Sequence, residues 1–220
     1  MPRCNRVDPY GDLHAVESRG LFTGNRGCLV DDAGRIVRHH QSRLWITCRT
    51  SFRDWRHPLA APHRWTPIFF LDDAVALAAG HRPCATCRRD DYRAYRDAVT
   101  AAASSSTPLR AAELDTRLAA ERHRRGRGLD RAADRIIWTA EHADAAELPD
   151  GTVVIGDRGP PLLLIASRVL AFDFDGWHDA VRHPDAPLHV LTPRTSVAAL
   201  RHGFTPTLHP SADVSRWHRR

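Results

Sequence analysis

A short segment that ends in two cysteines places the strongest constraint on how this chain folds. Residues 68–87 read IFFLDDAVALAAGHRPCATC, in which an apolar run is followed by Asp72, an alanine-rich stretch and Gly80. Asp72 is a suitable N-cap for a helix, and Gly80 is a suitable residue to end it, because glycine readily adopts the left-handed conformation found there. The pattern therefore predicts a buried strand, a short helix, and then Cys84 and Cys87 on the turn that follows.

Cysteines two residues apart are typical of zinc sites, because the turn between them aims both sulfur atoms at one tetrahedral ion. A thioredoxin-like redox pair opens a helix after a strand, whereas this pair follows the end of a helix. The first residues, MPRCNRVDPYGDL, lack the apolar stretch of a secretion signal, so we expect a reducing cytoplasm that disfavours disulfides. We therefore expect Cys84 and Cys87 to form half of a zinc site.

Two further ligands are needed to complete a tetrahedral zinc site. Cys28 and Cys48 each lie on a predicted strand before the pair, which makes them the expected completion. Cys4, near the start of the chain, is the cysteine left over. If Cys28 points elsewhere, the substitutes are His57, His63 and His81.

The rest of the sequence predicts further strands and helices. CLVDDAGRIV reads as a hairpin, and RLWITCRTSF reads as a strand with Trp45 and Thr47 on the face opposite to Cys48. Helices are expected at 89–103, 109–124 and 192–203, and strands within 148–174 and at 189–191.

These elements indicate the α+β class. We expect a small N-terminal zinc-binding module, made of a β-hairpin and a helix, to pack with helices and with a β-rich C-terminal part. Residues 1–103 would form the zinc-binding domain, and residues 104–220 a helix followed by the β-rich region. The stretch SSSTP is the best linker between them, although the two regions also fit one compact unit.

The basic residues of the chain are concentrated in one window. All 32 are arginine, and residues 35–64 hold seven of them against a single acid, Asp54. Tryptophans are interleaved with these arginines, and this mixture favours nucleic acid, because guanidinium groups neutralise phosphates while rings stack on unpaired bases. The alternative is a strand pair with solvated arginines and core tryptophans. The residues expected to contact the polymer, which we take to be DNA, are Arg43, Arg49, Arg53 and Trp55.

The segment FFLDDAVALAAGHRPCATCRRDD resembles the zinc-binding DNA-repair domain of the Ada protein family. Those domains carry a strand, a helix that ends in A-x-x-A-G, and then R-P-C-x-x-C followed by basic residues. The resemblance covers roughly residues 30–92, and its one departure is Phe52, where the family usually has another cysteine. The wider pattern, which ends in LTPRTSVAALRHGFTPTLHPSA, is similar to that of a broadly distributed bacterial protein family.

The resemblance implies a zinc-binding fold that lies beside DNA. Cys48 matches the family's methyl-accepting cysteine, a catalytic residue, while Cys84 and Cys87 match its second pair of metal ligands. A purely structural four-cysteine site is the alternative, because Phe52 replaces one ligand of the family. The basic residues that would attract a phosphate to Cys48 are Arg49, Arg53, Arg82, Arg88 and Arg89.

Other catalytic patterns give weaker signals. The motifs H-E-x-x-H, G-x-S-x-G, G-x-G-x-x-G and the P-loop are absent, and no H-x-E precedes the cysteine pair as a zinc deaminase would require. A second group that is suited to a divalent metal and to phosphodiester hydrolysis lies near the C-terminus, although alternating Phe and Asp there also fit a half-exposed strand. Its members are Asp173, Asp175, His178 and His183.

Taken together, the patterns predict a cytoplasmic zinc protein that contacts nucleic acid, with a role in DNA repair or modification. Two alternatives stay open: a nucleic-acid-processing hydrolase or alkyl transferase, and a biosynthetic or interaction protein whose zinc is purely structural. No run of about 18 apolar residues is present, so no membrane partner is expected. The sequence leaves the oligomeric state open.

Overall fold

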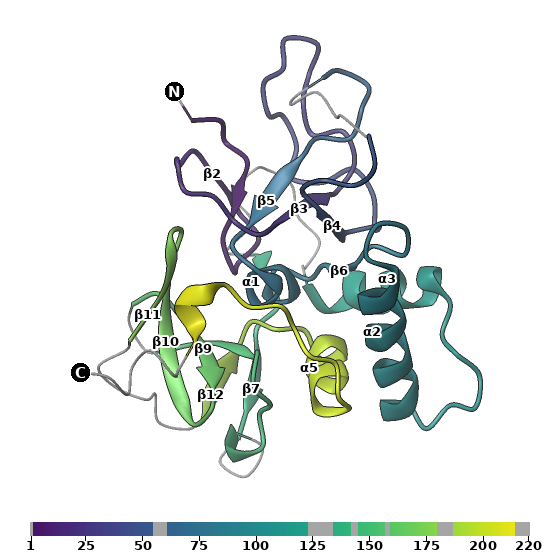
Figure 1. Cartoon of the computed structure of the whole chain (residues 1–220), viewed down its shortest axis with the longest axis vertical. Coiled ribbons are helices and arrows are strands. Elements are labelled where there is room, and N and C mark those ends of the chain that lie inside the picture. The colour runs from purple at the N-terminus through teal and green to yellow at the C-terminus, as the bar shows by residue number, and fades with distance from the viewer. Residues whose placement is uncertain are drawn as a thin grey trace.

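The computed structural model describes residues 2–54, 61–122, 134–141, 145–156, 159–179 and 187–213. Within these ranges the chain forms four α-helices and two six-stranded sheets, one from each half of the sequence. Figure 1 shows the first sheet in purple and blue above helix α1, and the second sheet in green below it. The expected α+β class is confirmed.

The first sheet has the strand order β2-β1-β5-β3-β4-β6. Its strands are β1 (Arg6–Val7), β2 (Leu13–His14), β3 (Phe22–Asn25), β4 (Ile46–Arg49), β5 (Ile68–Phe70) and β6 (Arg82–Pro83). Strand β4 pairs with β3 in antiparallel fashion and with β6 in parallel fashion, so it lies between them.

The strand expected around Cys48 forms over its central residues, with the expected alternation of faces. Trp45 and Thr47 are buried on one face, whereas Ile46 and Cys48 are half-buried on the other. The hairpin expected over residues 28–37 is reduced to one isolated bridge, between Val30 and Ile36.

Helix α1 (Asp73–Ala78) forms where the sequence predicts it. The Asp72 side chain accepts a hydrogen bond from the Val75 N–H at 3.0 Å, and Gly80 ends the helical segment with a φ of +83°. Every residue of α1 is buried, and its alanine and valine side chains belong to a core that both sheets share. The helix therefore lies at the centre of the molecule, as Figure 1 shows.

The second sheet is antiparallel throughout, in the order β11-β10-β9-β8-β12-β7. Its strands are β7 (Trp138–Ala140), β8 (Val153–Ile155), β9 (Pro161–Ile165), β10 (Arg168–Asp173), β11 (Gly176–Asp179) and β12 (Leu188–Val190). A short 3₁₀ turn, η2 (Pro210–Ala212), packs against β11.

Three further helices gather beside the sheets. They are α2 (Arg89–Ala102), α3 (Ala111–Arg122) and α5 (Arg194–Arg201). A second hydrophobic cluster joins them through Tyr95, Leu114 and Leu200, and the Tyr95 hydroxyl lies 3.0 Å from the Ser196 hydroxyl. None of the helices in the described part of the chain combines the length and the apolar character that crossing a lipid bilayer requires.

The two predicted regions share one core. Phe70 from the first sheet and Leu163 and Trp177 from the second belong to the same buried cluster around α1. The Trp177 Nε1–H donates to the Asp72 carboxylate at 2.6 Å, which adds a polar link between the regions. The boundary between residues 103 and 104 stays a prediction.

Candidate metal centre

Cys84 and Cys87 lie on the turn that connects β6 to α2, and backbone hydrogen bonds hold this turn in place. The Cys84 N–H donates to the Thr47 carbonyl at 2.9 Å, and the Arg88 N–H donates to the Cys84 carbonyl at 3.1 Å. The Thr86 N–H lies 3.4 Å from the Cys84 sulfur. The turn is therefore fixed against β4, the strand that carries Cys48.

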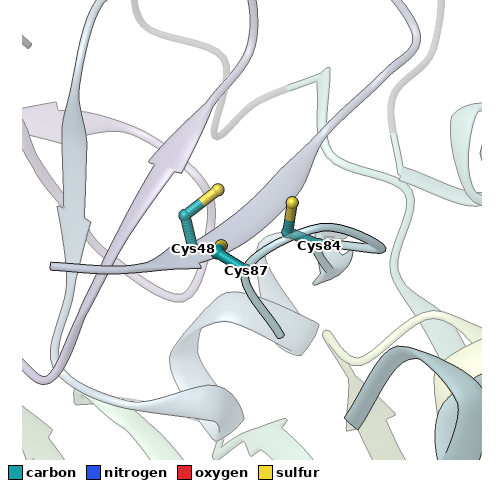
Figure 2. Close-up of side chains that lie close together, drawn as sticks. All are labelled: Cys48, Cys84 and Cys87. Carbon is teal, nitrogen blue, oxygen red and sulfur yellow. The ribbon is translucent and has the colours of Figure 1, made fainter. Parts of the chain in front are cut away.

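The structure brings three of the predicted ligands together. The sulfur atoms of Cys48, Cys84 and Cys87 all lie within 4.8 Å of one another. Figure 2 shows the three side chains grouped where β4 meets the cysteine turn. Sulfur atoms that bind one zinc ion tetrahedrally at about 2.3 Å lie about 3.8 Å apart, so sulfurs within 4.8 Å of one another are near the spacing of a metal site. These three cysteines can bind a metal ion, and we call them the cysteine cluster.

The three sulfurs lie close enough to shift the pKa values of one another. Hydrogen bonding from Cys48, and then from Cys87, lowers the pKa of Cys84 to about 2. Hydrogen bonding to Cys84, then to Cys87, together with burial, raises the pKa of Cys48 far above its usual range. Because three thiolates in such a small space repel one another, a bound cation is needed to hold all three deprotonated.

Cys28 does not join the cluster, which corrects the prediction that it supplies a ligand. Its sulfur lies 3.6 Å from the Val30 carbonyl. Thr23 is the residue of β3 that stands opposite Cys48. Cys28 lies beyond the end of β3 at Asn25 and after Gly27, whose φ is +99°, so it is not on the strand that faces Cys48.

The substitute ligands considered for Cys28 lie elsewhere or outside the described residues. His63 pairs with Asp32 at 3.4 Å, and His81 is fully buried beside Arg26. His57 falls outside the described residues. Among the residues that the structure describes, the cluster therefore contains three ligands, all of them cysteines.

The cysteine cluster lies against a cavity of about 420 Å³, which we call the cysteine cavity. Its walls come from β3, β4 and β5 and from the segment before β5, and they include the rings of Phe52, Trp65 and Phe69. Cys84 and Cys87 are only 7% and 8% exposed, whereas Cys48 is half-buried. Cys48 is thus the residue of the three with the largest exposed surface.

Arg88 is buried, which corrects its prediction as a nucleic-acid contact. Its guanidinium forms two hydrogen bonds to the Asp73 carboxylate, at 2.6 and 2.8 Å. It also lies 3.9 Å from the centre of the Phe22 ring. With 1% of its surface exposed, Arg88 is part of the support of the cysteine turn.

Arg82 is likewise buried, and its prediction as a nucleic-acid contact is also corrected. Its Nε and Nη2 atoms donate to the two carboxylate oxygens of Asp115 at 2.8 and 2.9 Å. This ion pair joins β6 to α3, so Arg82 is occupied inside the protein.

The other arginines predicted to contact nucleic acid keep their side chains at the surface. Arg43, Arg49, Arg53 and Arg89 are exposed, and Arg49 lines the cysteine cavity. Trp55 falls outside the described residues.

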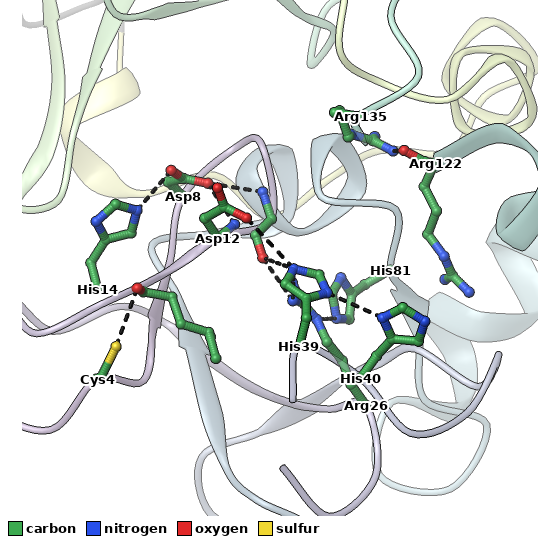
Figure 3. A network of polar contacts seen from close by, with 12 residues as sticks. Cys4, Asp8, Asp12, His14, Arg26, His39, His40, His81, Arg122 and Arg135 are labelled. Carbon is green, nitrogen blue, oxygen red and sulfur yellow. Dashed lines mark hydrogen bonds and ion pairs between the residues drawn. The ribbon is translucent and has the colours of Figure 1, made fainter. Parts of the chain in front are cut away.

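Trp45 is a core residue. Its position among the arginines of residues 35–64 had suggested a ring that stacks on bases. Trp45 is 1% exposed, and the guanidinium carbons of Arg26 and Arg122 lie 4.1 and 3.9 Å from its ring centre. Figure 3 shows these arginines together with His39, His40, His81 and Arg135. Burial, and then Arg135, lowers the pKa of Arg122 to about 9. These residues form a buried cationic and aromatic cluster that sequence reasoning missed.

The C-terminal acidic group also forms in part. Ligand atoms of Asp173, Asp175 and His178 lie within 4.8 Å of one another at the tip of the β10–β11 hairpin, and all three residues are exposed. His183 falls outside the described residues. Exposed carboxylates commonly gather on hairpins without a metal, so the cysteine cluster is the stronger candidate.

Sequence reasoning also missed the aromatic wall of the cysteine cavity. Phe69 and Cys48 both stand opposite Thr23, one on each neighbouring strand, so they share one face of the sheet. Ile68, Phe69 and Phe70 are all apolar, so the sequence alone does not mark Phe69 as the residue that faces the cavity; in the structure the outer two are buried. No family model, curated protein or solved structure matches this chain.

Proposed function

We propose that this chain is a zinc protein that contacts nucleic acid through the surface around its cysteine cluster. The observation that carries the proposal is the convergence of three cysteine sulfurs at the wall of a cavity that an exposed arginine also lines. Three sulfur ligands at this spacing suit zinc, which prefers tetrahedral coordination and binds thiolate strongly.

The surroundings of the sulfurs support a metal-bound thiolate state. The N–H groups of Thr86 and Arg49 donate to the sulfurs of Cys84 and Cys87 respectively. Hydrogen bonds of this kind favour the negatively charged form of a ligand. Zinc, when bound, would withdraw further charge from the sulfurs and keep them deprotonated.

Charge around the cluster supports a polyanionic partner. Arg49 directly follows Cys48, Arg53 lies four residues later, and Arg89 is the second residue after Cys87. All three side chains are exposed, whereas Arg82 and Arg88 form buried ion pairs with Asp115 and Asp73. Exposed guanidinium groups attract phosphate and bind it with two parallel hydrogen bonds.

The proposal is tested by measuring zinc content and DNA binding on the same preparation. Affinity for a labelled DNA should fall steeply as salt rises, because each phosphate contact adds about 0.9 to the slope of log affinity against log salt. The double variant Arg49→Ala/Arg89→Ala should bind more weakly and with a shallower slope. Arg201→Ala on α5 removes the same kind of charge at a distance and serves as the control. DNA binding that is absent, or indifferent to the double variant, would refute the nucleic-acid part of the proposal.

A second candidate function is alkyl transfer to Cys48, and the exposure pattern favours it. Cys48 is the half-buried member of a cluster whose other two cysteines are buried. Its sulfur would attack the methyl carbon of a methylated phosphate, so that a sulfur–carbon bond forms while the carbon–oxygen bond breaks. The phosphodiester would leave as an anion that Arg49 can accept.

Mass spectrometry separates this second function from metal binding alone. After incubation with DNA that carries methyl phosphotriesters, Cys48 should gain a methyl group in the wild type and in Cys28→Ser. If the protein binds zinc and DNA but Cys48 gains no methyl group, the alkyl-transfer proposal is wrong and the cysteine cluster is structural.

A further inference from the structure

A second cavity adjoins the cysteine cavity. This second cavity has a volume of about 620 Å³, and we call it the Arg38 cavity. Asn25 and Trp65 line both cavities, so the two adjoin at these residues. Arg64 and Leu44 also line the Arg38 cavity, next to Cys28, the cysteine that does not join the cluster.

The walls of the cysteine cavity suit a flat aromatic ligand. Phe52, Trp65 and Phe69 contribute rings, and Ile46 adds an apolar surface between them. At about 420 Å³ the cavity falls within the range of roughly 300–1,000 Å³ that is usual for small-ligand sites. Asn25 adds a polar group: its Oδ1 accepts from the Gly27 N–H at 2.7 Å, and its amide N–H groups are donors for a ligand.

Arginines flank this aromatic section at both ends. Arg49 lies at the cysteine end, and Arg38 and Arg64 line the Arg38 cavity, all with exposed side chains. Of the two acids in the Arg38 cavity, Asp31 pairs with Arg35 at 2.9 Å and Asp32 lies 3.4 Å from the His63 ring, and in the described part of the chain neither forms an ion pair with Arg38 or Arg64. The flanking arginines therefore remain positive sites for an anionic ligand.

We infer that the two adjoining cavities bind single-stranded nucleic acid, with one unpaired base in the cysteine cavity and neighbouring phosphates on Arg49, Arg38 and Arg64. This inference rests on the proposed function and specifies the form of its nucleic acid. The bases of a duplex are paired and stacked inside the helix, so they cannot enter a cavity without unpairing. An unpaired base can stack on aromatic rings while the backbone follows flanking arginines.

The test compares a labelled oligothymidine with a duplex of the same length by fluorescence anisotropy, using the zinc-loaded full chain. The single strand should bind at least tenfold more tightly than the duplex. Trp65→Leu should weaken single-strand binding roughly ten- to hundredfold, the effect expected for one lost stacking partner. Arg38→Ala/Arg64→Ala should weaken binding and lower the salt slope by about 1.4, because each phosphate contact on a single strand contributes about 0.7. Phe172→Leu, an aromatic of the second sheet, is the control for the ring, and Arg201→Ala is the control for the charge.

The outcomes separate this inference from the proposed function. The inference is wrong if the duplex binds as tightly as the single strand. It is also wrong if single-strand binding is unchanged in Trp65→Leu and in Arg38→Ala/Arg64→Ala. In both cases the proposed contact with nucleic acid still stands. If the protein binds neither single-stranded DNA nor the duplex, then both this inference and the nucleic-acid part of the proposed function are wrong. Zinc content and circular dichroism are measured for each variant, and Phe69→Leu replaces Trp65→Leu if the latter does not fold.

Discussion

The guanidinium of Arg88 forms a two-point ion pair with the carboxylate of Asp73, with an Nη1–Oδ1 distance of 2.6 Å and an Nη2–Oδ2 distance of 2.8 Å. Arg88 follows Cys87 directly, and Asp73 is the first residue of the central helix α1. Arg88 Nη1 also donates to the Thr47 hydroxyl at 2.9 Å. Because Thr47 precedes Cys48, one buried side chain connects both parts of the cysteine cluster to the core.

Replacing Arg88 should therefore destabilise the protein and the cysteine cluster together. Arg88→Met leaves the Asp73 carboxylate buried without its partner, and we expect the free energy of unfolding to fall by about 3–5 kcal/mol. Urea denaturation of the metal-loaded chain measures the loss. Arg89→Met, at the neighbouring exposed position, should change stability by no more than about 0.5 kcal/mol. Equal effects of the two variants would show that the ion pair does not support the turn.

Asp72 offers a second test of how the two sheets are joined. Its Oδ2 accepts hydrogen bonds from the Trp177 Nε1–H and from the His209 N–H, at 2.6 and 3.0 Å. In Asp72→Asn the side-chain NH2 would face either these two donors or the Val75 N–H that Oδ1 accepts, so we expect a loss of about 3 kcal/mol. Burial raises the pKa of Asp72 to about 6, so the comparison is made at pH 7.5, where the carboxylate is ionised. Asp90→Asn, at an exposed position of α2, is the control and should be nearly neutral.

His81 should make the protein less stable in mild acid. Burial, and then the neighbouring Arg26, holds the pKa of His81 well below its usual range, and its Nε2 accepts from the Arg26 Nε–H at 3.2 Å. In the unfolded chain a histidine takes up a proton below about pH 6.5, whereas the folded chain keeps His81 neutral. The unfolded state is therefore favoured as the pH falls, by up to about 1.4 kcal/mol per pH unit.

The pH dependence is measured as the free energy of unfolding between pH 6.5 and 5. His81→Gln does not titrate, so its stability should fall less over this window than that of the wild type, by up to about 2 kcal/mol. His202→Gln, an exposed position after α5, should follow the wild type. Parallel curves for His81→Gln and the wild type would mean that His81 titrates normally in the folded state.

The sequence correctly predicted the parts of the site whose structure depends on residues close in sequence, namely the helix α1 and the cysteine turn. The Asp72 cap, the glycine at position 80 and the following cysteine pair specify a helix and a turn with little help from the rest of the chain. The alternation around Cys48 correctly separated its face from that of Trp45 and Thr47. Helix capping and hydrophobic periodicity depend on residues that are close in sequence, so they can be recognised without the fold.

Long-range pairing was beyond the reach of such signals. Cys28 was expected on a strand beside the cluster, but β3 ends at Asn25, and Thr23 is the residue that pairs with Cys48. The burial of Arg82, on strand β6, depends on Asp115, an acid 33 residues away on helix α3. An arginine beside a cysteine pair looks the same in sequence whether it faces solvent or an internal carboxylate, so Arg82 and Arg88 were assigned to the wrong environment.

The metal content of cysteine variants tests the central claim most directly. Zinc is measured by mass spectrometry in the wild type, Cys48→Ser and Cys28→Ser, all purified in the same way and checked for folding by circular dichroism. The wild type and Cys28→Ser should each retain a single zinc ion per chain, whereas Cys48→Ser should lose it or bind it at least tenfold more weakly. Loss of zinc in Cys28→Ser with full retention in Cys48→Ser would contradict a centre built from Cys48, Cys84 and Cys87.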